Sequence, residues 1–397
     1  MSHTPQLASD RAWAARDIHR KPTNPDGALA GLSFAAKDLF QIGGEITRAG
    51  SAVFDNDSPA KNDAAFVAKA RGMGATLNFT TNMDALAYGF ITNNPEYGLA
   101  CNPLDERRIC GGSSGGSAAS VAAGLVDFAL GTDTSGSIRV PAAFCGTYGY
   151  KPSAGIFSTE GVQPLSPTFD RPGIFTRDAK LLSRVAHALA QSGTLDSTAA
   201  QPNKIGMLAG QFASGLDPAV KDSIRAFSDS LVARSGIEIA GVQAARAATY
   251  ILVADEAAQI HVGNLRSQPE SFDPETRHRL AAASLIKPEW CNAARKIQAD
   301  FAWRFECLFK DFDILLAPCV NMVAPFAEDI EKPRETGHPP LRASLGMLTQ
   351  PISLIGAPVV AIPLETSLGF PTAVQLIGRI GSDAMLLNFA KDLGCQI

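Results

Sequence analysis

The sequence lacks several features that would place it in a common class of protein. No stretch approaches the roughly 18 apolar residues of a membrane-spanning helix, and residues 1–21 contain no apolar core of a secretory signal. The seven cysteines are scattered without a CxxC pair, and no HExxH motif occurs. A disulfide framework and a metal site are therefore not indicated. We expect a cytoplasmic protein with reduced thiols, no cofactor and no membrane contact.

The chain also has no large excess of positive or negative charge. The 397 residues include 35 Lys and Arg against 39 Asp and Glu, which gives a formal net charge of −4. Such a balance offers no surface for nucleic acid. The composition, 46% hydrophobic and 19% charged, is that of a globular protein. No change of composition marks a linker, so we predict a single domain over residues 1–397.

Segments typical of strands alternate with segments typical of helices. The expected strands are 31–37, 75–79, 126–130, 204–208, 237–242, 313–318, 358–363 and 372–377, and the expected helices are 62–72, 117–125, 217–236 and 288–310. This alternation predicts an α/β fold with a large mixed or mostly parallel sheet covered by helices.

Two loops rich in glycine and serine each adjoin a predicted strand or helix. The first, GGSSGGS over 111–117, has neither the Gly-Lys-Ser/Thr ending of a phosphate loop nor the spacing of a dinucleotide loop. The second, GTDTSGS over 131–137, follows a strand and ends at Ser137. Its successive backbone N–H groups could surround an oxyanion. Taken alone, the first loop would more often be a flexible glycine turn than a binding site.

A serine nucleophile needs a base, and none of the six histidines lies in a comparable setting. These histidines are His3, His19, His187, His261, His278 and His338. Lys37 ends an apolar strand, where a lysine is unusual. Burial disfavours the charged form of an amine, lowers its pKa and makes it available as a base. A lysine that reaches from the strand end to water is the simpler alternative.

Taken together, these segments resemble the amidase signature family of Ser–Ser–Lys amide hydrolases. The resemblance is carried by GGSSGGSAASVAAGLVDFALGTDTSGSIRVPAAFCGTYGYKPSAG over 111–155, by the 24 positions between Ser113 and Ser137, and by FAAKDLF around Lys37. The chain is most similar to compact, indole-3-acetamide hydrolase-type members. The resemblance implies the family's fold, with a large mixed, twisted sheet covered on both faces by helices. It also implies a catalytic core over about 30–180, a variable substrate-lining region over about 180–290 and a closing segment over about 290–397.

The resemblance also implies roles for individual residues. Ser137 attacks the amide carbonyl, Ser113 after a cis peptide bond relays the proton, and Lys37 accepts it. Backbone N–H groups of Thr134, Ser135, Gly136 and Ser137 would hold the oxyanion. Ser114 and Asp133 would support these groups, and Arg139 would anchor the loop.

Substrate choice is less well determined by the sequence. Met83, Tyr88 and Phe90 are candidate pocket residues, although each is equally suited to the core. Family likeness favours an aryl-acetamide as the small-molecule substrate, and it allows a homodimer. Ser135 stands where many members have glycine, Ser353 where many have asparagine, and only 36 residues precede Lys37. Two alternatives remain: a glutaminase-type subunit of an amidotransferase, and a non-catalytic scaffold.

Overall fold

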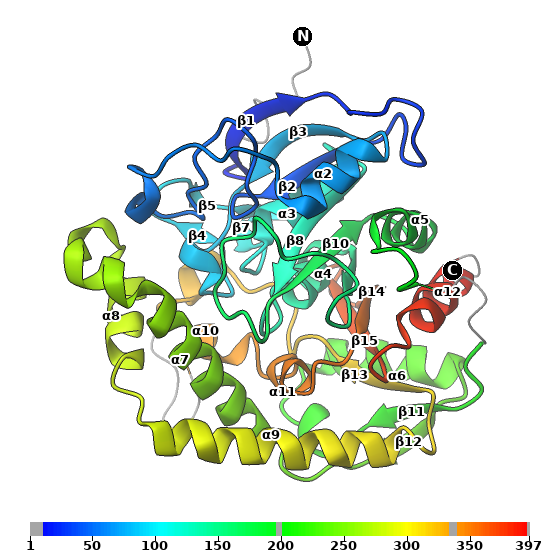
Figure 1. Ribbon diagram of the computed structural model, residues 1–397. Coiled ribbons are helices and arrows are strands. Elements are labelled where there is room, and N and C mark those ends of the chain that lie inside the picture. Colours follow the sequence, from blue (N-terminus) through cyan, green and yellow to red (C-terminus); the bar gives the residue numbers. More distant parts are fainter. Residues whose placement is uncertain (1–10, 196–200, 333–339, 395–397) are drawn as a thin grey trace.

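The computed structural model describes residues 11–195, 201–332 and 340–394, and it contains one large mixed sheet (Figure 1). Eleven strands form this sheet. In spatial order they are β1 (Ala14–Arg20), β3 (Thr76–Thr81), β2 (Ser33–Lys37), β8 (Phe128–Asp133), β10 (Arg171–Thr176), β9 (Tyr148–Lys151), β14 (Val359–Glu365), β15 (Pro371–Gly378), β13 (Ile314–Pro318), β11 (Ile205–Leu208) and β12 (Arg234–Ile237). Strand β2 runs parallel to β3 and β8, and β11 runs parallel to β12 and β13. The other pairs are antiparallel.

Helices flank this sheet, as predicted. Those of four or more residues are α2 (Ala65–Gly72), α3 (Gly115–Ala122), α4 (Arg139–Cys145), α5 (Ala179–Leu189), α6 (Pro218–Ser230), α7 (Val242–Ser267), α8 (Pro274–Ala283), α9 (Pro288–Leu308), α10 (Leu341–Ser344), α11 (Gln350–Leu354) and α12 (Asp383–Leu393). The mixed α/β fold predicted from the sequence is therefore confirmed.

Two hydrophobic clusters lie on the two faces of the sheet. Along β2, Phe34 and Ala36 belong to one cluster and Ala35 to the other, because successive side chains of a strand point to opposite faces. Helices α3 and α4 pack in the cluster of Ala35, and α5 and α12 pack in the cluster of Phe34. By the same alternation Lys37 is directed to the face that α3 covers.

Two predicted boundaries between residues 217 and 242 were wrong. The helix expected over 217–236 ends at Ser230, and the strand expected over 237–242 lies earlier, at β12. Gly241, with a φ of 90°, instead precedes the long helix α7. The alternation of Ile237, Ile239 and Val242 suggested a strand, but the left-handed conformation at Gly241 turns the chain into a helix.

The side chains of the six described cysteines, Cys101, Cys110, Cys145, Cys291, Cys307 and Cys319, are free thiols. Within the described residues, no helix has the length and apolar character needed to cross a membrane. Three residues discussed above, His3, His338 and Cys395, lie outside the part of the chain that the structure describes.

Candidate active site

The sheet brings Lys37 and the second serine loop to one edge. Strands β2 and β8 are parallel neighbours, with Ala36 opposite Leu130. Their carboxyl ends therefore meet, and Lys37 is the last residue of β2 while the loop 134–138 follows β8. Carboxyl ends of parallel strands are where α/β proteins commonly place their sites. Helix α3 packs against both strands and carries the first serine loop at its N-terminus.

Lys37 is fully buried between two hydroxyl groups. Its Nζ lies 2.8 Å from Ser113 Oγ and 3.0 Å from Thr132 Oγ1. Burial lowers the pKa of Lys37 to about 7, although the negative charges of Asp84, Asp170 and Asp133 oppose this effect. At neutral pH a large share of the amine is consequently unprotonated, and its lone pair can accept a proton from the Ser113 hydroxyl.

Ser113 is held by a tight turn before α3. The peptide bond between Gly112 and Ser113 is cis, and the Ser113 carbonyl accepts a hydrogen bond from the backbone N–H of Asp84 at 3.3 Å. A side chain at Gly112 would collide with the Asp84 carboxylate and the backbone N–H of Ile91. Glycine is therefore required at this position, because no Cβ fits the close approach.

The loop that carries Ser137 presents unpaired backbone N–H groups. Among the hydrogen bonds of the described residues, none is donated by the backbone N–H of Thr134, Ser135, Gly136 or Ser137. Gly136 has a φ of 142°, and a Cβ there would collide with Thr349. The Thr349 hydroxyl also donates to the Ser135 carbonyl at 2.7 Å. Ser135 itself has no positive φ, so serine is accommodated where relatives have glycine.

A buried ion pair joins the two residues that flank the same loop. Arg139 donates from Nε and Nη2 to the two carboxylate oxygens of Asp133, at 3.0 and 2.9 Å. Burial alone would raise the pKa of Asp133, but the Arg139 guanidinium outweighs this effect and holds the pKa below its usual range. Arg139 also donates to Gln375 and to Ser353, at 2.8 and 2.6 Å. The pair is fully enclosed, and the contacts of Arg139 join the Ser137 loop to the segments that carry Ser353 and Gln375.

Ser114 supports the neighbouring strand. Its hydroxyl donates to the Thr132 carbonyl at 3.2 Å and accepts from the Thr132 backbone N–H at 3.4 Å. Ser114 therefore ties the first serine loop to the end of β8. Ser137 is 3% exposed, and its hydroxyl makes no hydrogen bond to any residue in the described part of the chain. A direct link from Ser137 to Ser113 thus belongs to the proposal below.

The three candidate pocket residues lie in different surroundings. Phe90 is half-buried and borders Gly136 of the Ser137 loop. Tyr88 packs its ring 3.8 Å from the Arg279 guanidinium. Met83 is fully buried beside Gly50. Of the three, Phe90 is the residue that lies beside the loop carrying Ser137.

Three residues that contact Lys37 or act on its charge were missed by the sequence reasoning. Thr132 binds Lys37, and the negative charges of the buried Asp84 and Asp170 act on its amine. Burial raises the pKa of Asp170 despite hydrogen bonds from Thr134, Ser166 and Leu165, and burial likewise raises that of Asp84. Acidic residues directly after a buried strand or within a serine-rich segment were the available signal.

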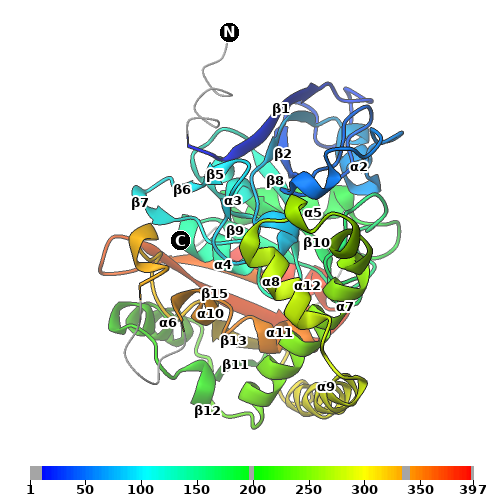
Figure 2. The same ribbon diagram turned by 90° about the vertical axis from the view of Figure 1, so that its left-hand side faces the viewer.

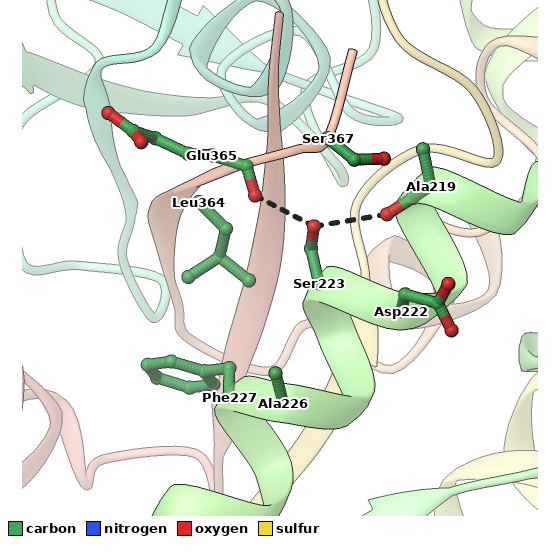
Figure 3. A pocket seen from close by; sticks show the side chains of 8 residues that line it. All are labelled: Ala219, Asp222, Ser223, Ala226, Phe227, Leu364, Glu365 and Ser367. Carbon is green, nitrogen blue, oxygen red and sulfur yellow. Dashed lines mark hydrogen bonds between the residues drawn. The ribbon is translucent and has the colours of Figure 1, made fainter. Parts of the chain in front are cut away.

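One pocket lies elsewhere in the molecule. It has a volume of about 400 Å³ between α6 and the end of β14, and Ser223 in its wall donates to the Ala219 and Glu365 carbonyls (Figure 3). Its lining includes the carboxylates of Asp222 and Glu365, but the Ser223 hydroxyl donates to backbone carbonyls and to neither carboxylate. A smaller cavity of about 160 Å³ lies beside Gly50 and Phe272. Neither is lined by a residue of the two serine loops, so the site at the sheet edge rests on geometry and not on cavity size.

The fold and the paired serine loops define an amide hydrolase of the amidase signature type. Residues 4–387 match the model of the Amidase family, and the chain belongs to that family. Its members that resemble this chain hydrolyse amides, and this protein is an enzyme acting on amides.

Individual relatives cover nearly the whole chain. The chain is 36% identical to AtzE, the 1-carboxybiuret hydrolase subunit of Pseudomonas sp. (strain ADP), over 96% of this chain and 87% of the relative. It is 32% identical to "Amidase 1" of Oryza sativa subsp. japonica, over 96% and 94%. It is also 32% identical to a glutamyl-tRNA(Gln) amidotransferase subunit of Methanospirillum hungatei JF-1, over 93% of each.

A solved structure agrees with this assignment. The structure described as "An unexpected vestigial protein complex reveals the evolutionary origins of an s-triazine catabolic enzyme" superposes with a TM-score of 0.88 at 35% identity. The match covers 93% of this chain and 84% of that chain.

Proposed function

We propose that the protein hydrolyses a carboxamide through an acyl-enzyme on Ser137, with Ser113 as proton relay and Lys37 as base. The observation that carries the proposal is the buried 2.8 Å hydrogen bond between Lys37 and Ser113, beside the end of β8, which leads into the Ser137 loop. A lysine whose pKa is lowered to about 7 can remove a proton near neutral pH.

The proposed first half-reaction forms the acyl-enzyme. Ser137 Oγ bonds to the amide carbon while its proton passes to Ser113, whose own proton passes to Lys37. The carbonyl oxygen becomes an oxyanion, which the unpaired N–H groups of the Ser137 loop stabilise. The C–N bond then breaks as the relay returns the proton to nitrogen. This return is essential, because an amide anion is a very poor leaving group.

The second half-reaction releases the acid. A water molecule gives its proton through Ser113 to Lys37 and attacks the acyl carbonyl, and collapse of the second tetrahedral intermediate returns the proton to Ser137. Lys37 is thus neutral at the start and end of each half-reaction. The buried ion pair of Asp133 and Arg139 keeps the loop in place throughout.

The substrate class is the finer part of the proposal. An aryl-acetamide remains a prediction that rests on family likeness. A glutaminase-type role is the second candidate, since several relatives are named as amidotransferase subunits. The hydrolase relative AtzE is also named as a subunit, so assembly with a partner chain or with a second copy is compatible with the family. A non-catalytic scaffold is disfavoured, because Lys37, Ser113 and Ser137 are all present and enclosed.

Ammonia release from a panel of primary amides tests the proposal. Indole-3-acetamide, benzamide, malonamide and glutamine would each be incubated with the protein and with the Ser137→Ala variant. We expect release by the unmodified protein alone. Equal release by both proteins would refute the role of Ser137, and selective use of glutamine together with a co-purifying chain would favour the glutaminase role.

A further inference from the structure

The ring of Phe90 is wedged between two glycines beside the nucleophile. A Cβ built on Gly136 would lie 3.3 Å from Phe90 Cε1, and a Cβ built on Gly346 would lie 2.6 Å from Phe90 Cζ. Gly136 directly precedes Ser137, so the ring borders the space that an acyl group bound to Ser137 must enter. The ring therefore lies close to both glycines.

Gln350 lies beside Phe90 on the same side of Gly346. Its Cδ would lie 3.3 Å from the same built Cβ, and the side chain is 8% exposed. Its Oε1 accepts a hydrogen bond from Arg246 Nε at 3.0 Å. A guanidinium has donors only, so the amide oxygen must face Arg246 and the Nε2 group must face away. Within the described residues no group accepts a hydrogen bond from Gln350 Nε2.

Arg246 adds a positive charge without a counter-ion. It lies on α7, a helix that packs beside α11 (Figure 2). Its side chain is half-buried, and its Nη2 donates to the Ala343 carbonyl. No ion pair joins Arg246 to a carboxylate of the described chain, and Nη1 has no acceptor there. Burial lowers the pKa of Arg246, and no acidic group opposes this effect. A desolvated guanidinium in this state attracts an anion, and its fork suits a carboxylate.

We infer that the acyl side of the site takes a short acyl group that ends in a carboxylate, limited in length by Phe90 and recognised by Gln350 and Arg246. The substrate class is then a compact amide such as malonamate, which replaces the aryl-acetamide that family likeness favours. This inference rests on the proposed function and adds the identity of the acyl group to it.

A comparison of charged and neutral amides tests the subsite. The rates with malonamate, malonamide, succinamate and phenylacetamide would be measured for the full chain. We expect kcat/KM for malonamate to exceed that for malonamide at least tenfold, since a charge-assisted hydrogen bond contributes about that factor. Succinamate should be poorer than malonamate because its chain is longer by one methylene.

Three variants separate recognition from folding. Arg246→Gln should raise KM for malonamate about tenfold or more and leave malonamide within about twofold. Phe90→Ala should improve phenylacetamide relative to malonamate. Arg184→Gln is the matched control, because Arg184 also donates to a backbone carbonyl, that of Ala28, and has no ion pair in the described chain. Arg184→Gln should change neither the rate with malonamate nor the rate with malonamide.

The outcomes distinguish this inference from the proposed function. Equal rates for malonamate and malonamide, or equal losses for both in Arg246→Gln, would overturn the carboxylate subsite and leave amide hydrolysis intact. A preference for phenylacetamide in the unmodified protein would likewise overturn it in favour of an aryl pocket. Failure to release ammonia from any amide of either panel would overturn both.

Discussion

Replacing Lys37 by methionine should remove the base and, at pH 7, stabilise the protein. The ordinary pKa of lysine is 10.5, and burial lowers that of Lys37 to about 7. Keeping such an amine partly neutral at pH 7 costs about 4 kcal/mol of folding free energy. Methionine has a similar length and no charge. Replacing Lys37 by methionine removes its two hydrogen bonds, to Ser113 and Thr132, which together contribute about 2 kcal/mol to folding stability. A net stabilisation of about 2 kcal/mol at pH 7 remains.

The sign of the pH dependence follows from proton binding. Between about pH 7 and 10.5 the unfolded chain binds a proton at Lys37 that the folded chain does not. The folding stability of the unmodified protein therefore rises with pH across this window. The free-energy cost of keeping Lys37 neutral in the folded state falls by the same amount. The advantage of Lys37→Met should shrink by about 3 kcal/mol between pH 7 and pH 9.5. Near pH 9.5 the variant should be no more stable than the unmodified protein.

Urea unfolding at these two pH values measures the difference. Lys151 is also buried with a pKa lowered to about 7, but its contribution is common to both proteins and cancels. Lys221→Met, at an exposed position of α6, is the control and should show no pH-dependent difference. A stability difference for Lys37→Met that is constant between pH 7 and 9.5 would refute the lowered pKa and, with it, the neutral base.

Three further outcomes follow from the same geometry. In the unmodified protein kcat/KM should fall about tenfold per pH unit below about pH 7, as Lys37 becomes protonated; a flat profile down to pH 5 would exclude Lys37 as base. Ser113→Ala should lower kcat at least 100-fold with little change in KM, measured by steady-state kinetics; a change confined to KM would assign Ser113 to binding. Arg139→Met should leave the Asp133 carboxylate buried without its partner and destabilise the protein by about 3–5 kcal/mol in urea unfolding. An unchanged midpoint would show that the pair does not hold the loop.

Much of the fold could be predicted because it depends on local patterns. The strand at 31–37 and the helix at 288–310 have clear apolar periodicity, and the structure places β2 and α9 there. The long helix α7 was missed since alternation before Gly241 imitates a strand. Strand β1 was missed because its side chains are largely polar and half-exposed at the sheet edge.

The candidate site likewise combines features that could be predicted from the sequence with features that could not. Two serine loops and a lysine at a strand end could be recognised from their composition and spacing. Contacts that depend on segments far apart in the chain could not. Ser353 and Gln375 reach Arg139 from more than 200 positions away, and Thr349 reaches the Ser135 carbonyl across 214 positions. The link from Phe90 through Gly346 to Gln350 likewise exists only in the folded chain.

Detection of the acyl-enzyme tests the central claim most directly. The protein would be mixed with its best amide substrate, quenched with acid during turnover, digested and analysed by mass spectrometry. The account predicts an acyl adduct on the peptide that contains Ser137, absent from the Ser137→Ala variant, which should release no ammonia. An adduct on another residue, or undiminished ammonia release by Ser137→Ala, would contradict it.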